Sequence, residues 1–337
     1  MKGINAQYMR VDVKENILYF IDPSILKTLL FDRTTRKNII WATNDYASLG
    51  EQYAADQQIV PSCITGLFGN TIRPRSDKSK AEQSARVRDK AEVFTPSWVC
   101  NCQNNLIDEA WFGRSGVFNT EKEKGWQTNH DKIVFPDEKG KSWCDYVKEN
   151  RLEITCGEAP YLASRYDSVT GEAIPVNERI GLLDRKLRVV SENTDNEEEW
   201  LSWAKKAVQS VYGFDWQGDN VLLARENLLF TVMDYYEEKF GRSLSKNLKY
   251  LNELARVLSW NIWQMDGLKF VVPNSCHDEV VTETTLMGES KKVVPCEGCK
   301  KNDPGKHNGI YCRIYDWSAN CSIEFYSLYK EGKNDGD

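Results

Sequence analysis

The sequence predicts an α/β protein built around a parallel sheet. Three short runs rich in aromatic and β-branched residues, at 152–155, 211–215 and 260–263, are expected to be its strands. Amphipathic segments long enough to be crossover helices separate them, which is typical of strands paired in parallel through right-handed connections. An acidic residue also stands near the end of each run, where α/β sheets of this kind bind their ligands.

The helices are predicted from apolar spacing and from end signals. Thr95 is expected to cap a helix, and Pro96 suits its first turn, where the N–H that proline lacks has no partner. Gly213 and Gly241 are expected to end the next two helices, because glycine readily adopts the left-handed backbone of a helix C-terminus. The predicted helices cover 96–111, 197–211, 219–240 and a segment that Ser245 caps.

Composition narrows the class of protein. A chain of 337 residues that is 41% hydrophobic can bury one large or two modest cores. No apolar run reaches the roughly 18 to 20 residues that span a bilayer, and the first residues lack the apolar core of a signal peptide. We therefore expect a cytoplasmic protein with no membrane partner. Ten cysteines in such a protein indicate thiols or metal ligands rather than a disulfide framework.

The chain divides into four predicted regions. Residues 1–75 form an N-terminal subdomain with strand-like runs at 17–21 and 37–42. Residues 76–150 hold a basic linker, the helix near Pro96 and a polar excursion; 151–270 form the ligand-binding domain, and 271–337 a cysteine-rich insertion with C-terminal strands. The net charge is −6, so DNA would have to meet a local basic patch. The basic residues near the linker fit either a solvated segment or phosphate contacts: Arg73, Arg75, Lys78, Lys80, Arg86, Arg88 and Lys90.

The segment Leu152-Glu-Ile-Thr-Cys-Gly-Glu-Ala-Pro-Tyr161 predicts a strand, a tight loop and a helix that together cradle a nucleotide-like cofactor. Glu153, Asp215 and Asp266 are expected to line the same crevice. Asp215 can accept hydrogen bonds from ribose hydroxyls, Asp266 from an adenine amine, and Glu153 can pair with a cationic amine. Taken singly, each acid is better explained as a surface turn or a helix cap, whereas their shared order along the strands favours a common crevice.

Four segments in chain order resemble motifs of the adenine-specific DNA methyltransferases of restriction-modification systems. They are Phe94-Thr-Pro96, Glu153 to Tyr161, Tyr212-Gly-Phe-Asp-Trp216 and Met265-Asp-Gly-Leu268. The resemblance implies a Rossmann-like fold, S-adenosylmethionine as cofactor and DNA as substrate, with Thr95 near the methionine carboxylate. The cofactor-binding residues that it implies are Phe94, Thr95, Pro96, Glu153, Thr155, Cys156, Gly157, Ala159, Tyr161, Asp215, Trp216, Asp266, Gly267 and Leu268.

The sequence departs from this family in three places, the first being Glu in place of Asp at position 153, which keeps the charge and lengthens the reach. Ala159 replaces the second loop glycine and Pro160 follows it, which crowds the approach of a ligand to the backbone. The Asn/Asp-Pro-Pro-Tyr/Phe motif that holds the target base is not found, so no catalytic residue is assigned. An incomplete sheet would leave strand 152–155 as an exposed apolar edge, and we expect a second polypeptide to supply the rest.

Cysteines cluster a second time between residues 276 and 312. A Cys-x2-Cys knuckle with one further cysteine on each side has the ligand count of a tetrahedral structural zinc site. His277 and His307 lie in the same stretch. The alternative is a reduced, solvent-facing loop whose cysteines are incidental. The predicted zinc ligands are Cys276, Cys296, Cys299 and Cys312.

Three functions remain in competition. The leading one is an S-adenosylmethionine-binding subunit, or half, of a DNA adenine-N6 methyltransferase. The second is a catalytically silent cofactor- or DNA-binding interaction protein derived from such a system. A nicotinamide-dependent dehydrogenase is weaker, because no Gly-x-Gly-x-x-Gly occurs and Thr95, Pro96 and Asp266 would have no role in it.

Overall fold

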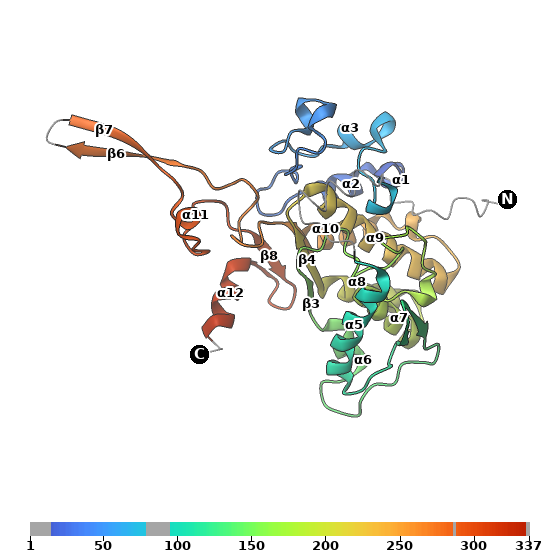
Figure 1. Ribbon diagram of the computed structural model, residues 1–337. Coiled ribbons are helices and arrows are strands. Elements are labelled where there is room, and N and C mark those ends of the chain that lie inside the picture. Colours follow the sequence, from blue (N-terminus) through green and yellow to red (C-terminus); the bar gives the residue numbers. More distant parts are fainter. Residues whose placement is uncertain (1–14, 79–94, 286–287, 335–337) are drawn as a thin grey trace.

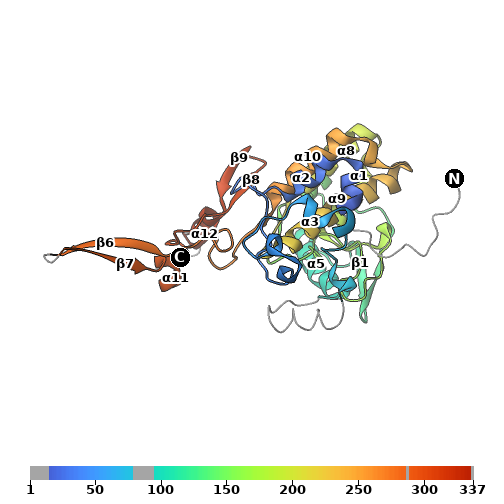
Figure 2. The ribbon, with the colours of Figure 1, turned by 90° about the horizontal axis from the view of Figure 1, so that it is seen from above.

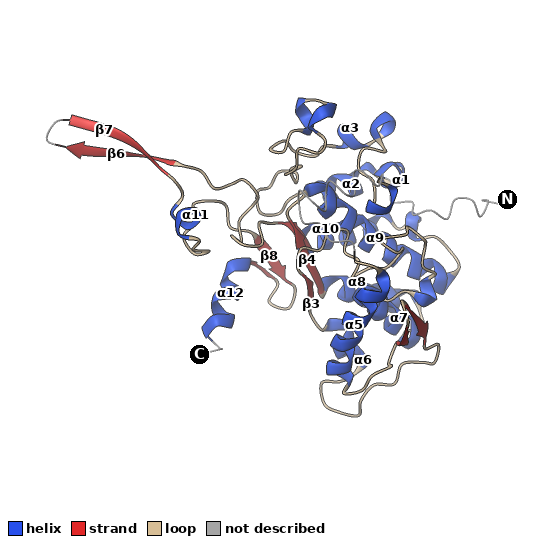
Figure 3. Ribbon diagram, viewed as in Figure 1, coloured by secondary structure: helices blue, strands red, loops and turns tan. Residues whose placement is uncertain are grey.

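A three-stranded parallel sheet lies beside a helical body, and a long hairpin projects away from both (Figure 1). The computed structural model describes residues 15–78, 95–285 and 288–334. Mixed α/β structure was predicted and is confirmed, as is the parallel pairing of the strands. Figure 3 shows that helices make up most of the body and that the strands of the sheet lie at its side.

The sheet has the order β3-β4-β5, so consecutive strands are neighbours. The strands are β3 (Arg151–Glu153), β4 (Val211–Asp215) and β5 (Ile262–Gln264). β3 is shorter than the predicted 152–155 because the chain turns after Glu153. Trp260, placed in the third strand by the sequence pattern, instead belongs to the preceding helix. Within the described residues β3 lies at an open edge, as expected.

One face of the sheet is covered by helices. Val211 and Ile262 point into the main apolar core, where the buried faces of α8, α9 and α10 pack against them. The helix predictions are largely confirmed, with shifts of one or two residues at the ends. Gly213 does not end α8 as predicted, because Ser210 is the C-cap of that helix and Gly213 lies within β4. The cap of α10 is Asn247, whose side chain accepts the Tyr250 N–H, and not Ser245. The bounds are α5 (Ser97–Phe112), α6 (Trp143–Lys148), α7 (Leu182–Asn193), α8 (Glu197–Gln209), α9 (Gly218–Phe240) and α10 (Leu248–Asn261).

The opposite face of the sheet carries a smaller apolar cluster. Tyr212, Phe214 and Trp263 point to this side, because side chains alternate along a strand. Phe325 covers them, with its ring centroid 5.0 Å from that of Trp263. It opens the last helix, after a short antiparallel pair of strands. These elements are β8 (Arg313–Asp316), β9 (Cys321–Glu324) and α12 (Phe325–Asn334).

The N-terminal region is helical where a strand was expected. Residues 17–21 lie in α1 (Glu15–Ile21), which is followed by α2 (Pro23–Leu30), and residues 37–42 form only isolated bridges. A run of five apolar residues fits either periodicity, and contacts with α2 settle it as helix. The remaining short elements are η2 (Ala47–Leu49), η3 (Glu51–Tyr53), α3 (Pro61–Ile64), η4 (Gly66–Phe68), η5 (Arg75–Asp77), β1 (Asn119–Lys122), β2 (Gly125–Thr128), η6 (Val176–Glu178) and η7 (Leu244–Lys246).

The projecting hairpin pairs β6 (Glu279–Thr285) with β7 (Gly288–Val294) in antiparallel register. It extends away from the helical body in both views (Figures 1 and 2), and α11 (Glu297–Lys301) lies at its base. None of the helices in the described ranges is both long and apolar enough to cross a membrane.

Candidate functional site

The loop after β3 is a tight cradle of left-handed backbone. Thr155, Gly157 and Ala159 have positive φ values of 49°, 54° and 62°. The Cys156 N–H donates to the carbonyl of Phe214 at 2.8 Å, which fixes the loop to the end of β4. A left-handed conformation costs roughly 1–2 kcal/mol for a residue other than glycine, so this loop stores strain at Thr155 and Ala159.

No helix follows this loop directly, so that part of the prediction is wrong. Residues 159–163 make one turn, in which the Ala163 N–H donates to the carbonyl of Ala159 at 2.9 Å. An irregular excursion then intervenes before α7 begins at Leu182. The turn is held by Asp184, whose carboxylate accepts the N–H of Ser164 at 2.8 Å. The local pattern at 152–161 could not reveal this inserted excursion.

Two of the predicted acids accept hydrogen bonds from backbone N–H groups of the loop. Glu153 accepts the backbone N–H of Leu162 at 3.2 Å and, more weakly, that of Tyr161 at 3.4 Å. Asp215 accepts the N–H of Gly157 at 3.0 Å through Oδ2. Burial raises the pKa of both carboxyl groups, Glu153 more strongly. The cradle therefore rests on buried carboxylates that a nearby positive charge would stabilise.

The segment before α5 is brought against the same loop. The side chain of Thr95 lies beside the hydroxyl of Tyr161, and burial raises the pKa of Tyr161 to about 12. The carbonyl of Thr95 accepts the Ser168 hydroxyl at 2.6 Å. Thr95 does not cap the helix as predicted, because α5 begins at Ser97 with Pro96 at the cap position and no side-chain cap. Phe94 lies outside the described residues.

The third acid forms a turn after β5. Asp266 Oδ1 accepts the backbone N–H groups of Leu268 at 3.0 Å and Lys269 at 3.2 Å, and the Lys269 ammonium lies 3.5 Å from Oδ2. Gly267 is required here, because a Cβ would lie 2.8 Å from the ring of Phe214. The Leu268 side chain is 82% exposed. The turn therefore presents a backbone-held carboxylate and an apolar side chain beside the end of β4.

The N-terminal region closes over these strand ends. The Trp216 indole N–H donates to the carbonyl of Ala42 at 2.9 Å, and Gln264 bonds both the N–H and the carbonyl of Ile40. The side chain of Trp216 is thus held by the backbone of Ala42.

Two residues in the described part of the basic segment do not have the solvent exposure expected of a linker. Arg75 and Lys78 are buried. The Arg75 N–H donates to Glu158 at 2.5 Å, and the Lys78 ammonium lies 3.8 Å from Asp219. The Lys78 ammonium therefore faces an acid of α9, and the backbone of Arg75 bonds an acid of the loop. The sequence pattern predicts neither contact. The predicted basic residues from Lys80 onward lie outside the described ranges.

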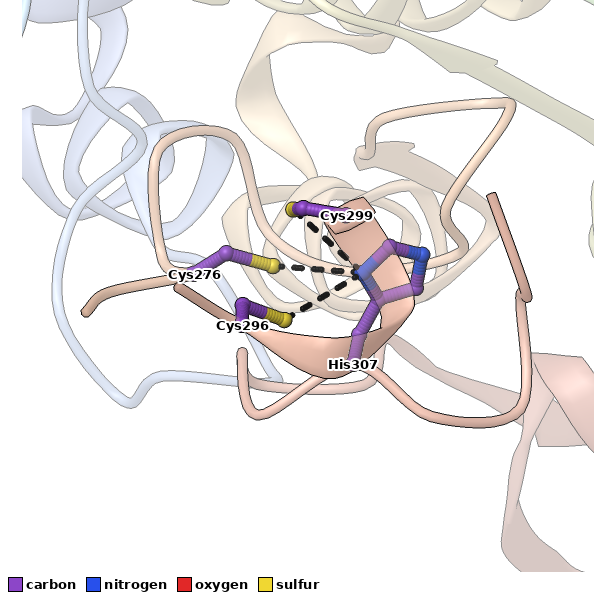
Figure 4. A group of neighbouring side chains, drawn as sticks. All are labelled: Cys276, Cys296, Cys299 and His307. Carbon is purple, nitrogen blue, oxygen red and sulfur yellow. Dashed lines mark hydrogen bonds between the residues drawn. The ribbon is translucent and has the colours of Figure 1, made fainter. Parts of the chain in front are cut away.

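A cluster of three cysteines and one histidine lies at the base of the projecting hairpin (Figure 4). Its ligand atoms all lie within 4.8 Å of one another. The His307 Nδ1 is 3.5 Å from the sulfur of Cys276, 3.7 Å from that of Cys296 and 3.6 Å from that of Cys299. This Cys3His cluster could hold a metal ion.

The surroundings are fitted to these four side chains. A Cβ at Gly298 would lie 2.6 Å from His307 Nδ1, and one at Gly309 would lie 3.0 Å from the sulfur of Cys276. Burial raises the pKa of the Cys296 thiol, but N–H groups that include that of Asn308 donate to the sulfur and bring the pKa down to about 6. One thiolate ligand is therefore prepared by the backbone.

Cys312 is not part of the cluster, and its prediction as a ligand is wrong. Its side chain is fully buried against the sheet, where the thiol donates to the carbonyl of Gln264 at 3.4 Å. His307 takes the fourth position instead. Counting cysteines favoured Cys312, whereas the pattern Cys296-x2-Cys299 followed by a histidine was the available signal for His307.

No protein-family model matches the chain, and it has no significant match among the curated proteins or the solved structures. Function is therefore inferred from the residues and their geometry.

Proposed function

We propose that this chain is the S-adenosylmethionine-binding part of a cytoplasmic DNA adenine-N6 methyltransferase of a restriction-modification system, with a Rossmann-like methyltransferase fold. The observation that carries the proposal is the meeting of four separate segments at the carboxyl edge of a parallel sheet. The loop after β3 contacts Thr95 through Tyr161, and it contacts Asp215 through the N–H of Gly157. Asp266 follows on the next strand, and the neighbouring Met265 N–H donates to the carbonyl of Asp215 at 2.9 Å.

The charges of this region suit the proposed cofactor. S-adenosylmethionine carries a sulfonium and an ammonium against one carboxylate, so its net charge is positive. Glu153, Glu158 and Asp215 are buried around the cradle, and burial raises the pKa of each. A cation that enters the cradle would offset part of the cost of ionising these buried groups.

Each acid has a proposed task. Thr95 and Glu153 would hold the methionine end, Asp215 the ribose hydroxyls and Asp266 the adenine amine. The cofactor supplies a methyl group already activated by its sulfonium, so the chain's contribution is to hold that methyl in line with the target nitrogen. The strained backbone of the loop keeps the N–H of Gly157 at a fixed position against Asp215.

Calorimetry of the full chain with S-adenosylmethionine tests the proposal. We expect one binding event per chain, with binding weakened at least tenfold in Asp215→Ala. The control is Asp137→Ala, which removes an exposed loop acid and should leave affinity unchanged. Absence of binding to the folded wild-type chain would refute the proposed function.

The open edge of the sheet provides a place for a second polypeptide. The Arg151 N–H donates to the Ser210 carbonyl at 2.9 Å, so the alternate residue, Leu152, turns its own N–H and carbonyl away from β4. Leu152 is also 46% exposed, although it shares the face of Tyr212. A groove of about 240 Å³ beside it is lined by Trp263 and Phe325, among others. We propose that a strand of the partner chain pairs with β3, fills this groove and brings the base-binding tetrapeptide to the cofactor.

Coexpression with the product of the adjacent reading frame tests the partner. We expect a stable complex that methylates adenine in DNA, and we expect Leu152→Asp to prevent its formation. Val134→Asp is the matched control, because Val134 is 70% exposed in a distant loop. A complex that tolerates Leu152→Asp would place the partner elsewhere.

A second function is favoured by one observation: no Asn-Pro-Pro or Asp-Pro-Pro occurs in the 337 residues. The chain would then be a catalytically silent cofactor- or DNA-binding interaction protein derived from such a system. Both functions include binding of S-adenosylmethionine. They differ in the coexpression experiment, where a complex that forms but transfers no methyl group would support the silent protein.

We further propose that the Cys3His cluster holds a structural zinc ion. In a tetrahedral site, Zn–S bonds of about 2.3 Å and a Zn–N bond of about 2.05 Å place sulfur and nitrogen roughly 3.6 Å apart. The three separations to His307 Nδ1 are 3.5, 3.6 and 3.7 Å. Four protein ligands leave no open position for substrate, so the role of the metal would be to fix the base of the hairpin.

Zinc content of the purified chain tests this site. We expect about one zinc ion per chain in the wild type and in Cys312→Ala, and less than about 0.2 in His307→Ala. His277→Ala is the matched control, since His277 is exposed in the same segment and outside the cluster. Loss of zinc in Cys312→Ala with retention in His307→Ala would reverse the assignment.

A further inference from the structure

The Cys3His cluster is joined to the Asp266 turn by a continuous set of backbone contacts. Val271 bridges Asp266 on one side and Tyr311 on the other. Beside this bridge, the Val272 N–H donates to the carbonyl of Ile310 at 2.8 Å. The segment that leaves the cluster after its histidine therefore forms the outer layer of the turn that holds the proposed adenine-binding acid.

The two chain segments that carry Cys276 and His307 are also bonded to each other. The Ile310 N–H donates to the hydroxyl of Ser275 at 3.0 Å, and the Asn308 side chain donates to the carbonyl of His277 at 2.7 Å. A metal ion bound by one ligand from each segment would lock these bonds in place. Without the metal, the segments are held at this end by hydrogen bonds that lie partly exposed to water.

We infer that the Cys3His centre is a positioning device for the Asp266 turn, acting through the 310–312 segment, so that its metal sets the affinity for the adenine end of the cofactor. The metal itself would not touch the cofactor. The part that concerns affinity rests on the proposed function, whereas the link between metal and turn does not.

Hydrogen exchange read by mass spectrometry tests the link without any cofactor. Removing the metal from the wild-type chain by chelation, or by His307→Ala, is expected to raise exchange in peptides that cover 265–272 by tenfold or more. Peptides that cover 154–162 should exchange unchanged, as should both regions in His277→Ala. Unchanged exchange at 265–272 after proven loss of metal would overturn the inference.

Binding of S-adenosylmethionine to four proteins tests the consequence. His307→Ala should weaken binding about tenfold in the wild-type background and by less than twofold in Asp266→Asn. Equal losses in both backgrounds would show a merely structural role and overturn the inference. Failure of the wild type to bind the cofactor at all would refute the proposed function, while the exchange result would still decide the link.

Discussion

Asp215 offers the sharpest test of how the cradle is held, through its replacement by alanine and by asparagine. Its Oδ2 accepts the Gly157 N–H at 3.0 Å, and its Oδ1 accepts the Gln217 N–H at 2.9 Å and the Asn220 amide at 3.2 Å. The residue is only 8% exposed, so water replaces these bonds poorly. At about 1 kcal/mol for each lost bond, Asp215→Ala should lower the free energy of unfolding by about 3 kcal/mol.

Asparagine separates the three bonds. Its carbonyl oxygen can retain the contacts with Gln217 and Asn220, whereas its amide donor would face the Gly157 N–H. Asp215→Asn should therefore cost about 1 kcal/mol. Urea unfolding followed by tryptophan fluorescence measures both values, and Asp137→Ala serves as the exposed control. If both variants unfold within about 0.5 kcal/mol of the wild type, the carboxylate does not hold the loop and the reasoning is refuted.

Three further predictions concern strain, pH and the metal site. Thr155→Asn should raise the free energy of unfolding by about 1 kcal/mol, because asparagine tolerates the left-handed backbone that Thr155 adopts in an exposed position; a less stable variant would contradict the strain. Glu15 is buried beside Glu226, and burial raises its pKa from 4.5 to about 8, so the folded state binds its proton more tightly than the unfolded state. The contribution of Glu15 to stability is full below pH 4.5 and is lost as the pH rises to about 8. Glu15→Gln should therefore stabilise the chain at pH 8 and not at pH 4.5. Equal denaturation midpoints of variant and wild type at pH 8 would contradict this prediction. Gly298→Ala should lower zinc content, because the added Cβ would lie 2.6 Å from His307 Nδ1; full zinc occupancy in this variant would show that the site can widen.

Residues typical of helix ends predicted two helix boundaries well. The boundaries at 197 and 240 agree with α8 and α9 because glutamates open the first helix and Gly241 closes the second in left-handed backbone. The same reasoning failed at 17–21, where five apolar residues fit both a strand and a helix. Packing against α2 selects the helix, and such a long-range contact is not contained in the local pattern.

The sequence predicted the acids of the candidate site but not the residues that approach from distant segments. Asp215 and Asp266 stand at the ends of their strands as expected, because strand endings are local features. The burial of Lys78 against Asp219 depends on how distant segments fold together, and nothing in the basic segment indicates it. His307 was passed over in favour of Cys312 because ligand choice depends on which side chains the return segment turns toward the knuckle.

Hydrogen exchange of the full chain with and without S-adenosylmethionine tests the central claim most directly. The cofactor should protect three separate stretches together: the loop at 153–162, the end of β4 at 212–217 and the turn at 265–269. The projecting hairpin should exchange unchanged and provides the internal control. Protection of all three stretches is the predicted result, and binding that leaves them unprotected, or no binding, would contradict the account.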